Sequence, residues 1–259
     1  FFPKDTTLSF ESSNDAIVKV DEHGVITAQA KGFASITVKV LMDGKSTYYS
    51  KSINVEVKDP YVTTGSILTN YFGLGGEVII PESLSLTEIG SYAFANFEYI
   101  DKTPEEITEE DPNFTKQWFI GDNTITKVII PEGVKKINCY AFANLTALEE
   151  IVLPSTMEAI EYGAFYGCTA LNYVTLENAT NIGPSTFYNC SNLVTIEIPA
   201  TVTSIGAKAF YNCCNIENVV LSEGLISIGE LSFYGCSTLK GIEIPDSVTQ
   251  IGNNVFESS

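Results

Sequence analysis

The sequence contains no arginine and few positive charges of any kind. All 14 basic residues are lysines, against 32 aspartates and glutamates, which gives a net charge of −18. Residues 1–60 hold 7 Lys and 8 acids (−1), so residues 61–259 hold 7 Lys and 24 acids (−17). A chain with this field and no guanidinium group is poorly suited to neutralising phosphates. We therefore expect no nucleic-acid partner and no anionic membrane; the acids also help to keep a long protein soluble.

Long hydrophobic runs are also missing. No apolar stretch approaches the roughly 18 residues that a membrane-spanning helix needs, so we expect no membrane insertion. The chain starts with Phe1-Phe2-Pro3-Lys4, without the basic and apolar regions of an export signal. Any such signal is expected to have been removed or to lie outside this sequence.

Catalytic and metal-binding residue types are scarce. The only histidine, His23, precedes a glycine in a turn-like sequence, which leaves no base for a serine or cysteine nucleophile. The six cysteines form no Cys-x-x-Cys motif, and the acidic residues of 105–111 lack the spacing of a calcium loop. We predict no enzyme activity, no cofactor and no metal site. A glycosidase with paired carboxylates and a calcium site in the acidic run are the weaker alternatives.

One short phrase, by contrast, occurs seven times. Each copy has a Gly or its substitute, two free positions, and then Ala-Phe or a close relative. The copies end at Phe94, Phe142, Phe165, Phe187, Phe210, Phe233 and Phe256. Successive gaps are 48, 23, 22, 23, 23 and 23 residues. A fixed period of this length predicts a solenoid, in which each coil buries its apolar face only against its neighbours.

Each coil opens with a pattern that predicts a short strand with one buried face. In Leu148–Pro154, Ile151 and Leu153 alternate with outward residues, and the final Pro ends the strand because it has no N–H to donate. A second apolar pair leads to a glycine such as Gly206, where a positive φ is expected. The Ala-Phe-Tyr-Asn-Cys run at 209–213 predicts a short helical turn that buries Phe and Cys.

Four cysteines follow their landmark Phe by three residues. They are Cys168, Cys190, Cys213 and Cys236. Stacked coils should place them about 4.8 Å apart, within disulfide reach but with parallel Cβ vectors. We predict buried, unpaired thiols that fill the core, and we expect a serine in this column to lack an assured hydrogen-bond partner.

The first gap holds one coil and about 25 extra residues (48 minus 23). This insertion, at about 98–122, contains the acidic run and Trp118, the only tryptophan. Insertions in solenoids often lie on the binding face. We predict either a binding loop or an acidic spacer without fixed structure.

Residues 1–59 differ in character from the repeats. Alternating patterns at 17–20, 25–28, 34–40 and 53–57, separated by glycine turns, predict a small antiparallel β-sandwich. Residues 60–74 are expected to link it to the solenoid of residues 75–259 or to cover the first coil. The predicted fold class is mainly β: about seven 23-residue coils of short strands and short helical turns, preceded by an incomplete sandwich.

The coil text of Leu193–Cys213 resembles the 23-residue repeat of BspA-like (Treponema-type) leucine-rich repeat proteins. The resemblance covers residues from about 75 to 259, apart from the insertion. It weakens at Asn138, Glu161 and Leu231, where Gly or Ala is expected. The resemblance implies a leucine-rich repeat solenoid.

The front segment is similar to group 2 bacterial immunoglobulin-like domains, through Val20–Ala28 and Gly32–Val38, with the strand before Pro3 missing. The pairing of the two modules resembles secreted surface proteins of gut and oral bacteria. It implies an extracellular, non-enzymatic protein of the bacterial cell surface that mediates adhesion or recognition of a host or bacterial protein or glycan. The alternative is a structural stalk or targeting module of a larger secreted enzyme.

The outward residues of the opening strands form the predicted partner surface. Strand stacking should align them into a continuous, concave face. Ile129, Val152 and Tyr173 would form an apolar and aromatic patch close to the insertion with Trp118. Its predicted neighbours are Lys127, Glu150 and Thr175. The alternative is that these residues merely suit strands. We expect the protein to act as a monomer.

Overall fold

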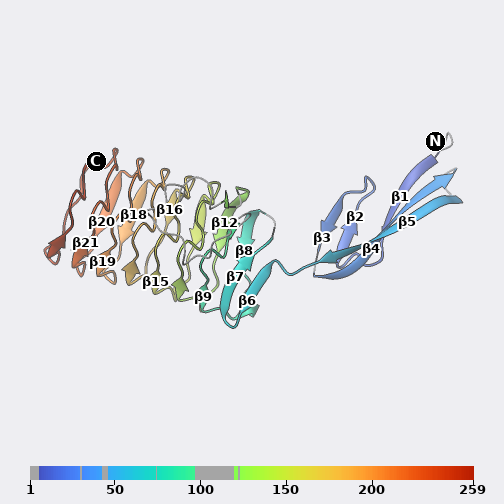
Figure 1. The fold of residues 1–259 in the computed structure, drawn as a ribbon, viewed down its shortest axis with the longest axis horizontal. Coiled ribbons are helices and arrows are strands. Elements are labelled where there is room, and N and C mark those ends of the chain that lie inside the picture. Colours follow the sequence, from blue (N-terminus) through green and yellow to red (C-terminus); the bar gives the residue numbers. More distant parts are fainter. Residues whose placement is uncertain (1–5, 30, 43–45, 74, 97–119, 122) are drawn as a thin grey trace, which may run out of the picture. The chain divides into compact units, whose positions relative to one another are not determined.

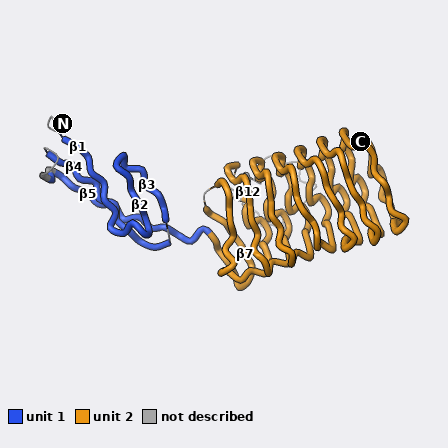
Figure 2. The backbone as a smooth tube through the Cα atoms, turned by 180° about the vertical axis from the view of Figure 1, so that it is seen from behind, with its two compact units in different colours: residues 1–60 blue, residues 61–259 orange. Residues whose placement is uncertain are grey.

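The computed structural model describes residues 6–29, 31–42, 46–73, 75–96, 120–121 and 123–259. The chain divides into two compact units, Phe1–Pro60 and Tyr61–Ser259 (Figure 2). Within the described ranges the only helical element is the 3-10 turn η1 (Glu82–Leu84), so the predicted mainly β class is confirmed. No helix in this part of the chain is long and apolar enough to cross a membrane. Most of the insertion, including Trp118, lies outside the described residues.

Unit 1 consists of antiparallel strands. They are β1 (Thr6–Ser12), β2 (Val18–Val20), β3 (Ile26–Ala28), β4 (Gly32–Met42) and β5 (Ser46–Val57). Strand β4 lies between β1 and β5, while β2 and β3 form a separate hairpin. Val18 of this hairpin packs on Ala34 and Ile36 of β4 to form a small core. The four predicted strands are present. Strand β1 is not predicted, because in its sequence only Leu8 and Phe10 alternate with polar residues.

Unit 2 is a solenoid whose coils contribute strands to two faces (Figure 1). The opening strands are β8 (Gly76–Ile79), β12 (Ile125–Ile129), β14 (Glu150–Val152), β16 (Tyr173–Val174), β18 (Thr195–Ile198) and β20 (Asn218–Leu221). The second sheet contains β9 (Glu88–Ile89), β13 (Lys136–Ile137), β15 (Ala159–Ile160), β17 (Asn181–Ile182), β19 (Ser204–Ile205), β21 (Ser227–Ile228) and β22 (Gln250–Ile251). Pairing between coils is parallel on both faces. Each coil except the last, which has only β22, thus has two strands in place of the single strand and bend that its sequence predicts.

A β-hairpin packs against the first coil. Strands β6 (Tyr61–Thr64) and β7 (Ile67–Tyr71) pair with each other, and β7 runs parallel to β9. The Tyr71 ring stacks on Phe94 at 4.9 Å between centroids, and the Tyr61 hydroxyl donates a hydrogen bond to the Ile79 carbonyl. The apolar end of the solenoid is therefore covered by two tyrosines. A further short pair joins β10 (Ala95–Asn96) to β11 (Ile120–Gly121).

The core is a set of columns, each containing one residue type from every coil. Neighbouring landmark phenylalanines stack with ring centroids 4.7–5.8 Å apart. From Phe142 to Phe233 these side chains are fully buried. A second column consists of the isoleucines of the second sheet, from Ile89 to Ile228, and it too is buried. Because each core residue packs on its equivalent in the next coil, one sequence period corresponds to one step between stacked side chains.

The predicted helical turn at each landmark Phe is wrong; the chain forms hydrogen-bonded turns there. Every second N–H points along the solenoid, as when the Tyr140 and Phe142 amides donate to carbonyls of the next coil. Only the intervening amides close local turns. In a helix all of these amides would donate to carbonyls of the same segment. The residues two before and two after Phe, such as Lys208 and Asn212, adopt left-handed backbone angles with φ of 56°.

The expected role of the repeated glycine is also wrong. Gly206 does not have a positive φ; a Cβ there would lie 2.4 Å from the Pro184 nitrogen of the preceding coil. The glycine therefore allows two backbones to approach each other. The expectation of Gly or Ala at position 231 is wrong as well. Leu231 is equivalent to Lys208, and both residues have left-handed backbone angles.

The cysteine column is buried and unpaired, as predicted. Each thiol donates to the carbonyl of the landmark Phe in the preceding coil; for Cys190 Sγ and the Phe165 oxygen the distance is 3.2 Å. In the last coil Ser259 occupies the cysteine position, and its Oγ makes the same bond to Phe233 at 2.7 Å. The expectation that serine lacks a partner in this column is therefore wrong.

We predict that Cys190→Ser destabilises the solenoid only slightly, by about 1 kcal/mol or less, because the hydroxyl inherits the bond to Phe165. Cys190→Ala, which removes the donor and leaves space, should be the more damaging change. Urea unfolding of both variants measures the difference. A serine variant less stable than the alanine variant would contradict the role of this hydrogen bond.

The buried thiols should also make the protein sensitive to alkali. Burial raises the pKa of the Cys168 thiol to about 12, well above that of an exposed cysteine. The unfolded thiol ionises first, so its contribution to stability is complete below about pH 9 and is lost as the pH rises toward 12. The destabilisation caused by Cys168→Ala should therefore shrink between about pH 8 and about pH 11. A difference in unfolding free energy that stays constant over this range would refute the prediction.

Candidate functional site

The predicted surface residues do share one face. Lys127 pairs in register with Glu77 and Glu150, and Glu150 pairs with Tyr173. In the adjacent column Ile129 pairs with Ile79 and Val152. Because paired residues of a sheet point to the same side, these side chains form one surface. We call the outward side of β8, β12, β14, β16, β18 and β20 the opening-strand face.

Large side chains on the opening-strand face are exposed. Tyr173 is 56% exposed, Val152 37% and Ile79 58%, while Ile129 is half-buried. Their immediate neighbours in the chain, such as Val128 and Ile151, point inward and are buried. The exposure thus follows from strand alternation.

Lys127 holds two carboxylates together at the start of this face. Its Nζ lies 3.0 Å from Glu150 Oε2 and 3.7 Å from Glu77 Oε1. The hydrogen bond with Glu150 raises the pKa of Lys127 above its ordinary value. The lysine is therefore charged at neutral pH, and it forms ion pairs with the glutamates of the two adjacent coils.

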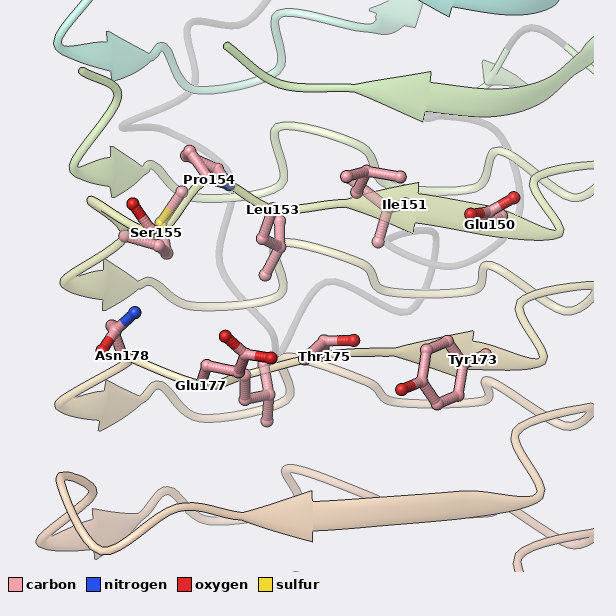
Figure 3. A pocket seen from close by; sticks show the side chains of 12 residues that line it. Glu150, Ile151, Leu153, Pro154, Ser155, Tyr173, Thr175, Glu177 and Asn178 are labelled. Carbon is pink, nitrogen blue, oxygen red and sulfur yellow. The ribbon is translucent and has the colours of Figure 1, made fainter. Parts of the chain in front are cut away.

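Two hollows lie on either side of the segment that begins at Tyr173. The first has a volume of about 430 Å³ and separates this segment from the preceding coil. Figure 3 shows Tyr173 and Glu150 at one end of it, Asn178 and Ser155 at the other, and Thr175 between them. The second hollow, of about 380 Å³, lies toward β18 and is lined by Thr195 and Glu197 as well as Tyr173, Thr175 and Glu177.

The hollows coincide with the one short coil. From Leu148 to Ile160 the chain advances twelve residues, but from Leu171 to Ile182 only eleven. The deletion falls after the opening strand, where Glu177-Asn178-Ala179 replaces a four-residue stretch containing Pro. Strand β16 ends early and does not join β18, so the opening strands form two separate sheets. A missing residue on the outer side therefore leaves recesses in the surface.

The structure brings together Ile129, Val152, Tyr173, Lys127, Glu150 and Thr175, while Trp118 lies outside the described residues. Sequence reasoning missed Glu177 and the hollows, although the single 22-residue interval between landmark phenylalanines marked their place. Within the described ranges, no group of three or more His, Cys, Asp or Glu side chains is arranged to hold a metal ion.

Solved structures of bacterial leucine-rich repeat proteins are similar to this chain. A leucine rich cell surface protein of Faecalibacterium prausnitzii is 26% identical over 78% of the chain, with a TM-score of 0.59. A leucine-rich repeat protein of Bacteroides ovatus is 26% identical over 78%, with a TM-score of 0.61. The T. pallidum leucine rich repeat protein is 27% identical over 72%, with a TM-score of 0.59.

The chain spans about half the length of the first two structures, 53% and 50%, and 77% of the T. pallidum protein. Among curated proteins the comparison finds no match. The model of the BspA type leucine rich repeat region matches six copies, within residues 73–144, 112–220 and 203–259, and none of them extends into unit 1. Since these matches cover well over half of the sequence, the chain belongs to the BspA type leucine rich repeat family.

Proposed function

We propose that this protein binds a protein or glycan of a host or bacterial surface through its opening-strand face, and that it does so outside the cell without catalysing a reaction. The observation that carries the proposal is the exposed Tyr173, which stands between two hollows, the first of which Val152 also lines. Exposed aromatic side chains next to recesses are typical anchors of binding surfaces.

The relatives support a surface location. The Faecalibacterium protein is described as a cell surface protein, and the shared repeat is the part of the chain that carries the opening-strand face. Adhesion to a host surface is the use that we propose for this face.

The side chains around the hollows favour binding over catalysis. They are hydroxyl, amide, carboxylate and apolar groups, which suit hydrogen bonding and packing. The four column cysteines are buried, and burial raises the pKa of Cys168 and Cys236 to about 12. A thiol of this kind stays protonated and unreactive at neutral pH.

To test the proposal, Tyr173→Lys and Val152→Lys are made separately, with Ile226→Lys as the control. Ile226 is 48% exposed, directly precedes β21 of the second sheet and lines neither hollow. We expect each test variant to weaken binding about tenfold or more, because a central anchor is replaced by a charged, hydrated group.

Binding is measured on panels of host matrix proteins and surface glycans, and circular dichroism checks that each variant folds. The control should retain the affinity of the wild type. Unchanged affinity in both test variants, with a ligand that the wild type captures, would move the site away from this face. Absence of any captured ligand would favour the stalk or targeting module.

A further inference from the structure

A long stretch around the two hollows has no positive charge of its own. From residue 148 to residue 207 the sequence contains no Lys, Arg or His. The same 60 residues carry six glutamates, at 149, 150, 158, 161, 177 and 197. Any cation that balances these carboxylates must come from another coil or from another molecule.

The preceding coil supplies cations to half of these glutamates. Lys127 pairs with Glu150 at 3.0 Å. Lys135 pairs with Glu158 at 2.9 Å, and Lys136 with Glu161 at 3.1 Å. Three of the four glutamates before the short coil are thus paired, and Glu149 is the fourth.

The two hollows lie where this internal supply of cations ends. Glu177 borders both hollows and Glu197 borders the second one. Both side chains are exposed, and neither takes part in an ion pair within the described part of the chain. Tyr173, which also borders both hollows, exposes its ring toward the end of the segment opposite Glu177 (Figure 3).

We infer that the hollows on either side of Tyr173 accept arginine or lysine side chains of a basic segment of a partner protein. This inference rests on the proposed function, because it specifies the partner of the same face. The flat face of a guanidinium group stacks on an aromatic ring, and its N–H edge bonds a carboxylate. Arginine side chains therefore suit both the Tyr173 end and the Glu177 end of the hollows.

The dimensions suit an extended basic segment. Alternate side chains of an extended strand point to the same side about 6.7 Å apart. The hollows adjoin across the single Tyr173–Glu177 segment, and neighbouring strands lie about 4.8 Å apart. Two basic residues separated by one small residue therefore reach both hollows. The charge of −17 on residues 61–259 also attracts such a segment over a longer range.

The test measures how the full chain binds a capped Arg-Gly-Arg peptide, by calorimetry at low salt. Glu177→Gln and Glu197→Gln should each weaken binding about threefold to tenfold, because a charge-assisted hydrogen bond becomes a neutral one. Tyr173→Leu, which keeps an apolar side chain but removes the ring, should weaken it about threefold. Glu223→Gln is the matched control, since it removes the same charge from an exposed position of a later coil.

An equal loss in the Glu223→Gln control would show that the peptide senses only the overall charge and would overturn the inference. Binding of a capped Glu-Gly-Glu peptide as strong as that of Arg-Gly-Arg would overturn it as well. The natural ligand separates the two proposals. If Tyr173→Lys abolishes capture of that ligand but Glu177→Gln and Glu197→Gln do not weaken Arg-Gly-Arg binding, the inference about basic residues fails alone. If Tyr173→Lys leaves capture of that ligand unchanged but Glu177→Gln and Glu197→Gln weaken Arg-Gly-Arg binding, the proposed function fails alone.

Discussion

The structure depends on one constraint, which is that each side chain of the core must meet its equivalent in the next coil. The stacked phenylalanine rings and the buried isoleucine column satisfy this constraint only if every coil returns to the same angular position. Backbone amides impose it again, because they bond to carbonyls of neighbouring coils. A glycine occupies the tight corner in five of the seven coils, where a Cβ would meet neighbouring backbone, while Asn138 and Glu161 occupy it in the other two.

The short coil shows which parts of this arrangement are rigid. The Phe165 and Phe187 rings still stack at 5.3 Å, and β15 still pairs with β17. The missing residue is absorbed entirely on the opening-strand face, where β16 and β18 fall into separate sheets. Apolar columns would lose much burial if they shifted, whereas an outer loop loses little. The hollows beside Tyr173 are therefore produced without disturbing the core.

The sequence predicts the solenoid, its columns and the buried cysteines, because a repeated period constrains packing directly. It does not predict the second sheet, whose strands such as Lys136–Ile137 contain two residues and are too short to show alternation. It mistakes the turns around Phe for helix because spacing alone does not reveal that alternate amides bond to another coil. The candidate surface is predicted at Val152 and Tyr173, but the neighbouring recesses arise from what one coil lacks, and residue types alone do not display an absence.

The direction of the inter-coil hydrogen bonds has an electrostatic consequence. On the wall with the landmark phenylalanines, amides such as that of Phe142 point toward the following coil. At the second sheet, amides such as those of Asn138 and Gly206 point toward the preceding coil. The peptide dipoles of the two walls thus oppose each other along the solenoid axis, whereas in an α-helix they add. These two walls therefore offset each other's backbone polarity, and the side-chain charges add to the potential that an approaching molecule meets.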